Sequence, residues 1–88
     1  METLTTTKQN RNLSEIAREI LNTWKNPSPH AMPYITAMLS IHSSDPNAGY
    51  FFETAETIVI YFLANATTFR GPDARRIKKE LRSNYNIK

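Results

Sequence analysis

Prolines divide this chain into segments that can each hold one helix or strand. The five of them, in 88 residues, are Pro27, Pro29, Pro33, Pro46 and Pro72. A proline inside a helix removes a backbone donor and clashes with the preceding turn, whereas in the first helical turn it costs almost nothing. Helices are therefore expected to end before a proline or to begin at one. At this length we expect one small domain.

The first segment has the pattern of an amphipathic helix from residue 12 to about residue 25. Asn12 is a good N-cap residue, and Glu15 three positions later can complete a capping box. Apolar residues then recur every three or four positions, at Leu13, Ile16, Ala17, Ile20, Leu21 and Trp24. We expect Trp24 to anchor the core. Residues 1–11 show no such period and are predicted to form a flexible N-terminal arm, with a single helical domain over residues 12–88.

Two further helices are predicted to begin at prolines. Pro33 opens a short helix that ends before a turn at residues 43–49, and Pro72 opens the last helix. One face of the short helix carries Tyr34, Ile35, Met38, Leu39 and at its end His42. The apolar stripe of the last helix consists of Ala74, Ile77, Leu81 and Tyr85.

The segment between these two, residues 52–69, is the most apolar. Its apolar residues repeat at helical spacing, at Ala55, Ile58, Val59, Phe62, Leu63, Ala66 and Phe69. The β-branched run at residues 57–60 also fits a strand, but the period favours a helix. Ile60 and Tyr61 lie outside the apolar arc, which indicates a helix contacted on two sides or a surface for a partner. The sequence thus predicts an all-α, compact single-domain bundle of about four helices.

Composition excludes most kinds of chemistry. The chain has no cysteine, which excludes disulfides, zinc–thiolate sites, iron–sulfur clusters and thiol nucleophiles. His30 and His42 are far apart with no acidic cluster beside them, so we expect no metal site and no cofactor. His42 is followed by two serines and Asp45, but catalytic triads are assembled in space and not from neighbours along the chain. We therefore expect that this protein is not an enzyme. The longest apolar run, residues 58–64, is far shorter than the ~20 residues of a membrane span, so we expect a cytoplasmic protein.

Positive charge is concentrated at the C-terminal end. Residues 70–88 contain seven Lys or Arg against two acidic residues, within a formal net charge of +3 for the whole chain. The residues predicted to contact nucleic acid (DNA or RNA) or an acidic protein surface are Arg75, Arg76, Lys78, Lys79 and Arg82. The plainer alternative is a solvated helix face, on which Arg76 can pair with Glu80 one turn later. A helix-turn-helix joined at residues 70–72 is also compatible, although Asp73 at its leading end would repel phosphate.

A second candidate surface is aromatic and apolar. Tyr50, Phe51 and Phe52 are consecutive and cannot all face one core, and we expect Tyr50 to be the most exposed. Together with Ile60 and Tyr61, Tyr50 and Phe51 form a predicted patch for a protein partner, the alternative being ordinary packing. Self-association through Ile60 is a third interpretation.

Several short motifs resemble those of small uncharacterised all-α proteins encoded on bacteriophages, plasmids and other mobile genetic elements. They are Trp24-Lys-Asn, Met32-Pro-Tyr-Ile-Thr-Ala-Met-Leu39, Ile58-Val-Ile-Tyr-Phe-Leu-Ala-Asn-Ala66 and Thr68-Phe-Arg-Gly-Pro-Asp-Ala-Arg-Arg-Ile-Lys-Lys-Glu-Leu81. Phe69 stands where relatives often carry Trp. The resemblance supplies a context and no mechanism. It implies a DNA-associated accessory factor or a modulator of host or defence machinery, including anti-CRISPR-like inhibitors.

Overall fold

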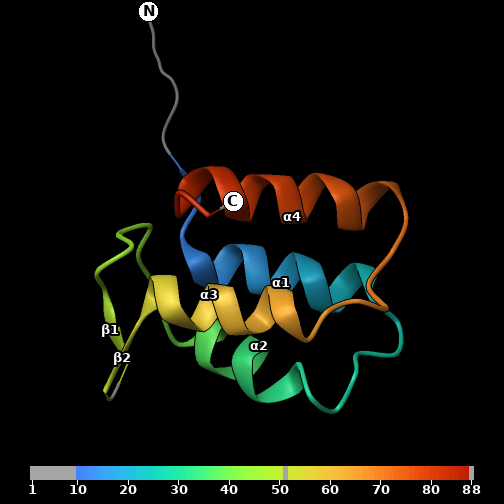
Figure 1. Cartoon of the computed structure of the whole chain (residues 1–88), viewed down its shortest axis with the longest axis horizontal. Coiled ribbons are helices and arrows are strands. Elements are labelled where there is room, and N and C mark those ends of the chain that lie inside the picture. Colours follow the sequence, from blue (N-terminus) through green and yellow to red (C-terminus); the bar gives the residue numbers. More distant parts are fainter. Residues whose placement is uncertain (1–9, 51, 88) are drawn as a thin grey trace, which may run out of the picture.

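Four helices and one short hairpin are formed by residues 10–50 and 52–87, the part of the chain that the computed structural model describes. The elements are α1 (Leu13–Thr23), α2 (Met32–Leu39), β1 (Gly49–Tyr50), β2 (Glu53–Thr54), α3 (Ala55–Ala64) and α4 (Pro72–Asn84). Figure 1 shows α1 and α3 running in one direction and α2 and α4 in the other, with α4 and α2 on opposite sides of α1. The predicted all-α bundle is confirmed. Within the described residues, no helix has both the length and the hydropathy to cross a membrane.

Local signals set the starts of α1 and α4 as the sequence predicts, and a cap that was not predicted from the sequence sets the start of α3. Asn12 and Glu15 form the capping box of α1. Thr54 caps α3 by accepting a hydrogen bond from the backbone N–H of Thr57. Pro72 occupies the first turn of α4, preceded by Gly71 at φ 110°, a left-handed conformation that side chains with a Cβ rarely adopt. The caps of α1 and α3 satisfy backbone donors that a helix itself leaves unpaired, and Pro72 has no such donor to satisfy.

The core lies where the four helices meet, and Trp24 is one of its anchors. Trp24 is 7% exposed, stacks on Phe69 with ring centroids 5.0 Å apart, and meets Phe62 edge-on at 6.5 Å. The predicted stripe of α4 is buried along its whole length, up to Tyr85 at 1% exposure. The prediction that Trp24 belongs to the core is therefore confirmed.

Helix α3 is shorter than predicted, because it ends at Ala64 and not near residue 69. Asn65 ends it: its side-chain amide donates to the carbonyl of Tyr61 at 2.9 Å. Ala66 and Phe69 are buried as expected, but they enter the core from the connection and not from a helix. Residues 65–71 therefore join α3 to α4, a longer link than the turn of about three or four residues in a helix-turn-helix. The helix-turn-helix interpretation is wrong.

A hairpin occupies the segment for which the sequence predicts a turn and the first residues of a helix. Gly49 pairs with Thr54 and Tyr50 with Glu53 in an antiparallel register. Phe52, at the end of this hairpin, is fully exposed at 102%. Phe51 and the side chain of Tyr50 lie outside the described part, so the expected exposure of Tyr50 stays a prediction.

Candidate functional site

The five basic residues predicted to bind an acidic partner lie in three different environments on α4. Arg76 is exposed but pairs with α1, Lys78 covers the connection from α3, and Arg75, Lys79 and Arg82 are exposed without an ion pair to a described residue. The helix therefore brings only three of the five onto one free surface. These three are called the basic stripe below.

Arg76 is part of an ion-pair network between α1 and α4. It pairs with Glu19 of α1 and with Asp73 one turn before it, at 3.4 Å. Glu19 also accepts from Arg11 at 2.8 Å, and Arg11 bonds both carboxylate oxygens of Glu80, at 2.7 and 2.9 Å. The predicted pairing of Arg76 with Glu80 is wrong. Glu80 pairs with Arg11, and Arg76 pairs with Glu19.

The network has two consequences. The hydrogen bond from Arg76, followed by that from Arg11, lowers the pKa of Glu19 below its ordinary value. The network also holds Arg11, which the sequence assigns to the N-terminal arm, against the folded domain. Arg76 therefore has a structural role between two helices.

Lys78 contacts the connection between α3 and α4. Its Nζ donates to the carbonyl of Ala66 at 2.8 Å and lies 5.8 Å from the centroid of the Phe69 ring. Burial lowers the pKa of Lys78, with smaller contributions from the positive charges of Arg82 and Arg70. The ammonium thus satisfies a backbone carbonyl in the connection, and its partial burial distinguishes it from the residues of the basic stripe; its contact with a partner stays a prediction.

The basic stripe is the part of α4 that faces solvent. Arg75, Lys79 and Arg82 follow one another at i, i+4 and i+7, a spacing that places them on one helix face. The two acidic residues of α4, Asp73 and Glu80, lie on the other border, beside Arg76 and Arg11. Between described residues, no ion pair reaches the stripe from any acidic side chain, Glu53 and Glu56 included.

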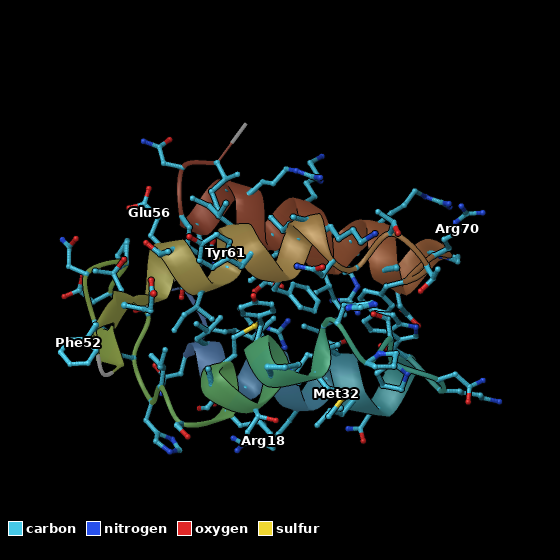
Figure 2. The ribbon with its side chains drawn as sticks, turned by 60° about the horizontal axis from the view of Figure 1, so that its bottom comes forward. Arg18, Met32, Phe52, Glu56, Tyr61 and Arg70 are labelled. Carbon is cyan, nitrogen blue, oxygen red and sulfur yellow. The ribbon has the colours of Figure 1, made fainter. Side chains whose placement is uncertain are left out.

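Arg70 extends the positive surface beyond the start of α4. Its Nε donates to the carbonyl of Thr67 at 3.3 Å, and the side chain is exposed. Figure 2 shows Arg70 projecting from the end of the molecule where α3 leads into α4. The positive charges of Arg70 and Arg82 both contribute to the lowered pKa of Lys78, so both guanidinium groups lie near the Lys78 ammonium. Arg70 was not among the predicted site residues, although its place in the basic C-terminal segment could have indicated it.

The second predicted surface is centred on α3. Ile60 and Tyr61, which the helical period places outside the buried arc, are 43% and 45% exposed. The ring of Tyr61 lies 5.7 Å from that of Tyr34 on α2, tilted by 46°. Figure 2 looks onto this side of the molecule, with Tyr61 on α3 and Phe52 at the far end of the hairpin.

A groove of about 220 Å³ opens beside the tyrosine pair. Its lining consists of Pro33, Tyr34, Ala37, Glu53, Ile58 and Tyr61. Among these, only Tyr61 was predicted from the sequence as a candidate site residue. Tyr34 and Glu53 could not be found from spacing, because α2, α3 and β2 supply the lining from separate parts of the chain.

Two side chains in the polar run after His42 bond to the backbone of the turn. Ser43 Oγ accepts from the N–H of Asp45 at 3.0 Å, and Asp45 accepts from the N–H of Asn47 at 2.9 Å, so both side chains build the turn. The described residues contain no group of three or more His, Cys, Asp or Glu side chains that could hold a metal ion. His30 and His42 are both exposed.

Comparisons with known proteins give no match, either to a family model, to a curated protein or to a solved structure.

Proposed function

We propose that this protein is a non-enzymatic binding module that contacts the phosphate backbone of DNA or RNA through the basic stripe of α4. The observation that carries the proposal is the separation of charge on this helix. Both of its acidic residues lie on the border that faces α1, whereas Arg75, Lys79 and Arg82 share the exposed border. A positive surface free of local counter-charge is what an electrostatic contact to phosphates requires.

The dimensions of the stripe suit a short stretch of backbone. Arg75 and Arg82 are seven residues apart, which at about 1.5 Å per residue is roughly 10 Å along the helix. Two of the three side chains are arginines, whose planar guanidinium groups can donate two hydrogen bonds to one phosphate. Arg70 adds a fourth cation at the N-terminal end of the helix. Contacts of this kind to phosphates fix the position of a protein on the nucleic acid and do not themselves read the base sequence.

An origin in a mobile genetic element stays a prediction, since no comparison bears on it. The same is true of the alternative function, a modulator or inhibitor of host or defence machinery acting through an aromatic–apolar patch.

The direct test is titration of fluorescently labelled duplex and single-stranded DNA, followed by anisotropy at several salt concentrations. The wild-type affinity should fall with salt with a logarithmic slope of about −0.9 per neutralised phosphate on duplex DNA. Lys79→Glu with Arg82→Glu should weaken binding at least about tenfold and reduce the slope by about two.

The matched control is Arg18→Glu with Lys25→Glu, which changes the net charge of the chain by the same amount. Both residues are exposed, and Figure 2 shows Arg18 on α1. The control should retain most of the wild-type affinity. Equal loss in both double variants would mean that net charge alone attracts DNA, and no binding at low salt would end the proposal.

A further inference from the structure

The groove between α2, α3 and β2 differs from the basic stripe in shape and in charge, and the proposed function does not use it. At about 220 Å³ it is smaller than the roughly 300–1,000 Å³ of clefts that enclose drug-sized ligands. It is therefore suited to one long side chain of a larger partner. Its walls are mostly apolar, with Glu53 as the charged residue of the lining.

The lining favours a cation. The faces of aromatic rings attract Lys and Arg, and Tyr34 and Tyr61 stand 5.7 Å apart and tilted, so that both border the same space. Glu53 adds a carboxylate that is exposed and forms no ion pair with any described residue. An anionic ligand such as a phosphate would be repelled here.

The surroundings favour a protein segment over a free amine. Phe52 directly precedes Glu53 and is fully exposed, and Ile60 directly precedes Tyr61 and is 43% exposed. Neither side chain lines the groove, because neighbours along a helix or strand point in different directions, but both add exposed apolar surface to the elements that form it. Exposed aromatic and aliphatic side chains around a pocket are typical of a protein interface.

We propose that this groove receives a lysine or arginine side chain from an apolar segment of a partner protein. The ammonium or guanidinium lies against the tyrosine pair and Glu53, and the apolar part of the inserted side chain packs on the apolar walls formed by Pro33, Ala37 and Ile58. The site is separate from the basic stripe and opposite to it in charge, so the two surfaces can be tested one at a time.

The test uses a model peptide as probe, acetyl-Ser-Leu-Lys-Leu-Ser-amide, and a second peptide with norleucine in place of lysine. Binding is followed by NMR as chemical-shift changes of the ring protons of Tyr34 and Tyr61. The lysine peptide should shift both rings and bind at least about fivefold more tightly than the norleucine peptide. Glu53→Gln should remove most of that preference, and Tyr61→Leu should weaken binding while keeping the groove apolar.

Glu56→Gln is the matched control, because it removes the same charge from the first turn of α3 without touching the groove lining. It should bind the lysine peptide as the wild type does. Equal loss in Glu53→Gln and Glu56→Gln, or equal affinity for both peptides, would overturn the proposal.

Two further measurements test whether the groove acts independently of the basic stripe and of a second copy of the chain. Lys79→Glu with Arg82→Glu should still bind the lysine peptide, so a failure of the nucleic-acid proposal does not affect the groove proposal.

Sedimentation of the wild-type protein across a concentration series tests whether a second copy fills the groove with its own basic stripe. Self-association that Lys79→Glu and Glu53→Gln both abolish would show that the occupant is this chain and would overturn the proposed partner.

Discussion

The two polar borders of α4 carry the same residue types and have different roles. On the border facing α1, Arg76 is held by Glu19 and Asp73, and Glu80 is held by Arg11. On the other border, Arg75, Lys79 and Arg82 have no ion-pair partner among the described residues. The positive charge that a binding surface can use is therefore smaller than the number of basic residues, and it depends on which border packs against a neighbouring helix.

The difference has a physical basis in the cost of leaving a charge unpaired next to a packed helix. Arg11, which is partly desolvated, and Arg76 lie where α1 and α4 meet, and the carboxylates of Glu19 and Glu80 offset their charges. Cations that remain in water need no partner, and neighbours of like charge cost only a few tenths of a kcal/mol on a helix. A functional stripe therefore costs little stability on the border that faces solvent.

The largest effect on stability is expected when the paired border is broken at Glu19. Glu19→Lys removes the shared acceptor of Arg11 and Arg76 and places a third cation between them. We expect the melting temperature to fall by about 5 °C, the change that roughly 1 kcal/mol produces in a domain of this size. Glu53→Lys makes the same charge change where no described ion pair exists, and its melting temperature should stay close to that of the wild type. Equal falls in both variants would show that the network does not hold α1 to α4.

A smaller effect is expected at Lys78, which lies one turn before Arg82 but bonds to the connection from α3. Lys78→Met keeps an apolar stem over Phe69 but removes the hydrogen bond to the carbonyl of Ala66. We expect a loss of about 0.5–1 kcal/mol in the free energy of unfolding, measured by urea denaturation. Lys79→Met, one residue later and exposed, is the control and should change stability little. A loss at residue 79 as large as at residue 78 would contradict the anchoring role.

The sequence predicts which face of α4 is buried but not which of its borders is paired. A helical period identifies the stripe from Ala74 to Tyr85, and Pro72 locates the start of the helix. The two borders beside that stripe are equivalent on a helical wheel. Their difference comes from Glu19, which is 57 residues from Arg76 along the chain. Local rules therefore favoured Glu80, one turn away, as the partner of Arg76.

The groove could not be predicted from the sequence for the same reason. Tyr34 has a helical spacing that suits a core residue, and Glu53 lies in a segment predicted as the start of a helix. Only the packing of α2 against α3, with the hairpin at one end, brings Glu53 beside Tyr34 and Tyr61. Exposure of Ile60 and Tyr61 was predictable because it follows from the period of one helix. The composition of a groove between three elements does not follow from any one of them.

The smallest effect is the pH dependence of the paired border. Hydrogen bonds from Arg76 and Arg11 lower the pKa of Glu19 in the folded state below its ordinary value of 4.5. The stability that Glu19 contributes is therefore fully present above pH 4.5, and it is lost as the pH falls through the lowered pKa. Glu19→Gln should be less stable than the wild type at pH 7. The difference in melting temperature should shrink below pH 4.5 and vanish once Glu19 is protonated in both states. A difference that stays constant from pH 7 to pH 2 would mean that Glu19 acts through packing and not through its charge. Ion pairing would then not explain why the two borders of α4 differ.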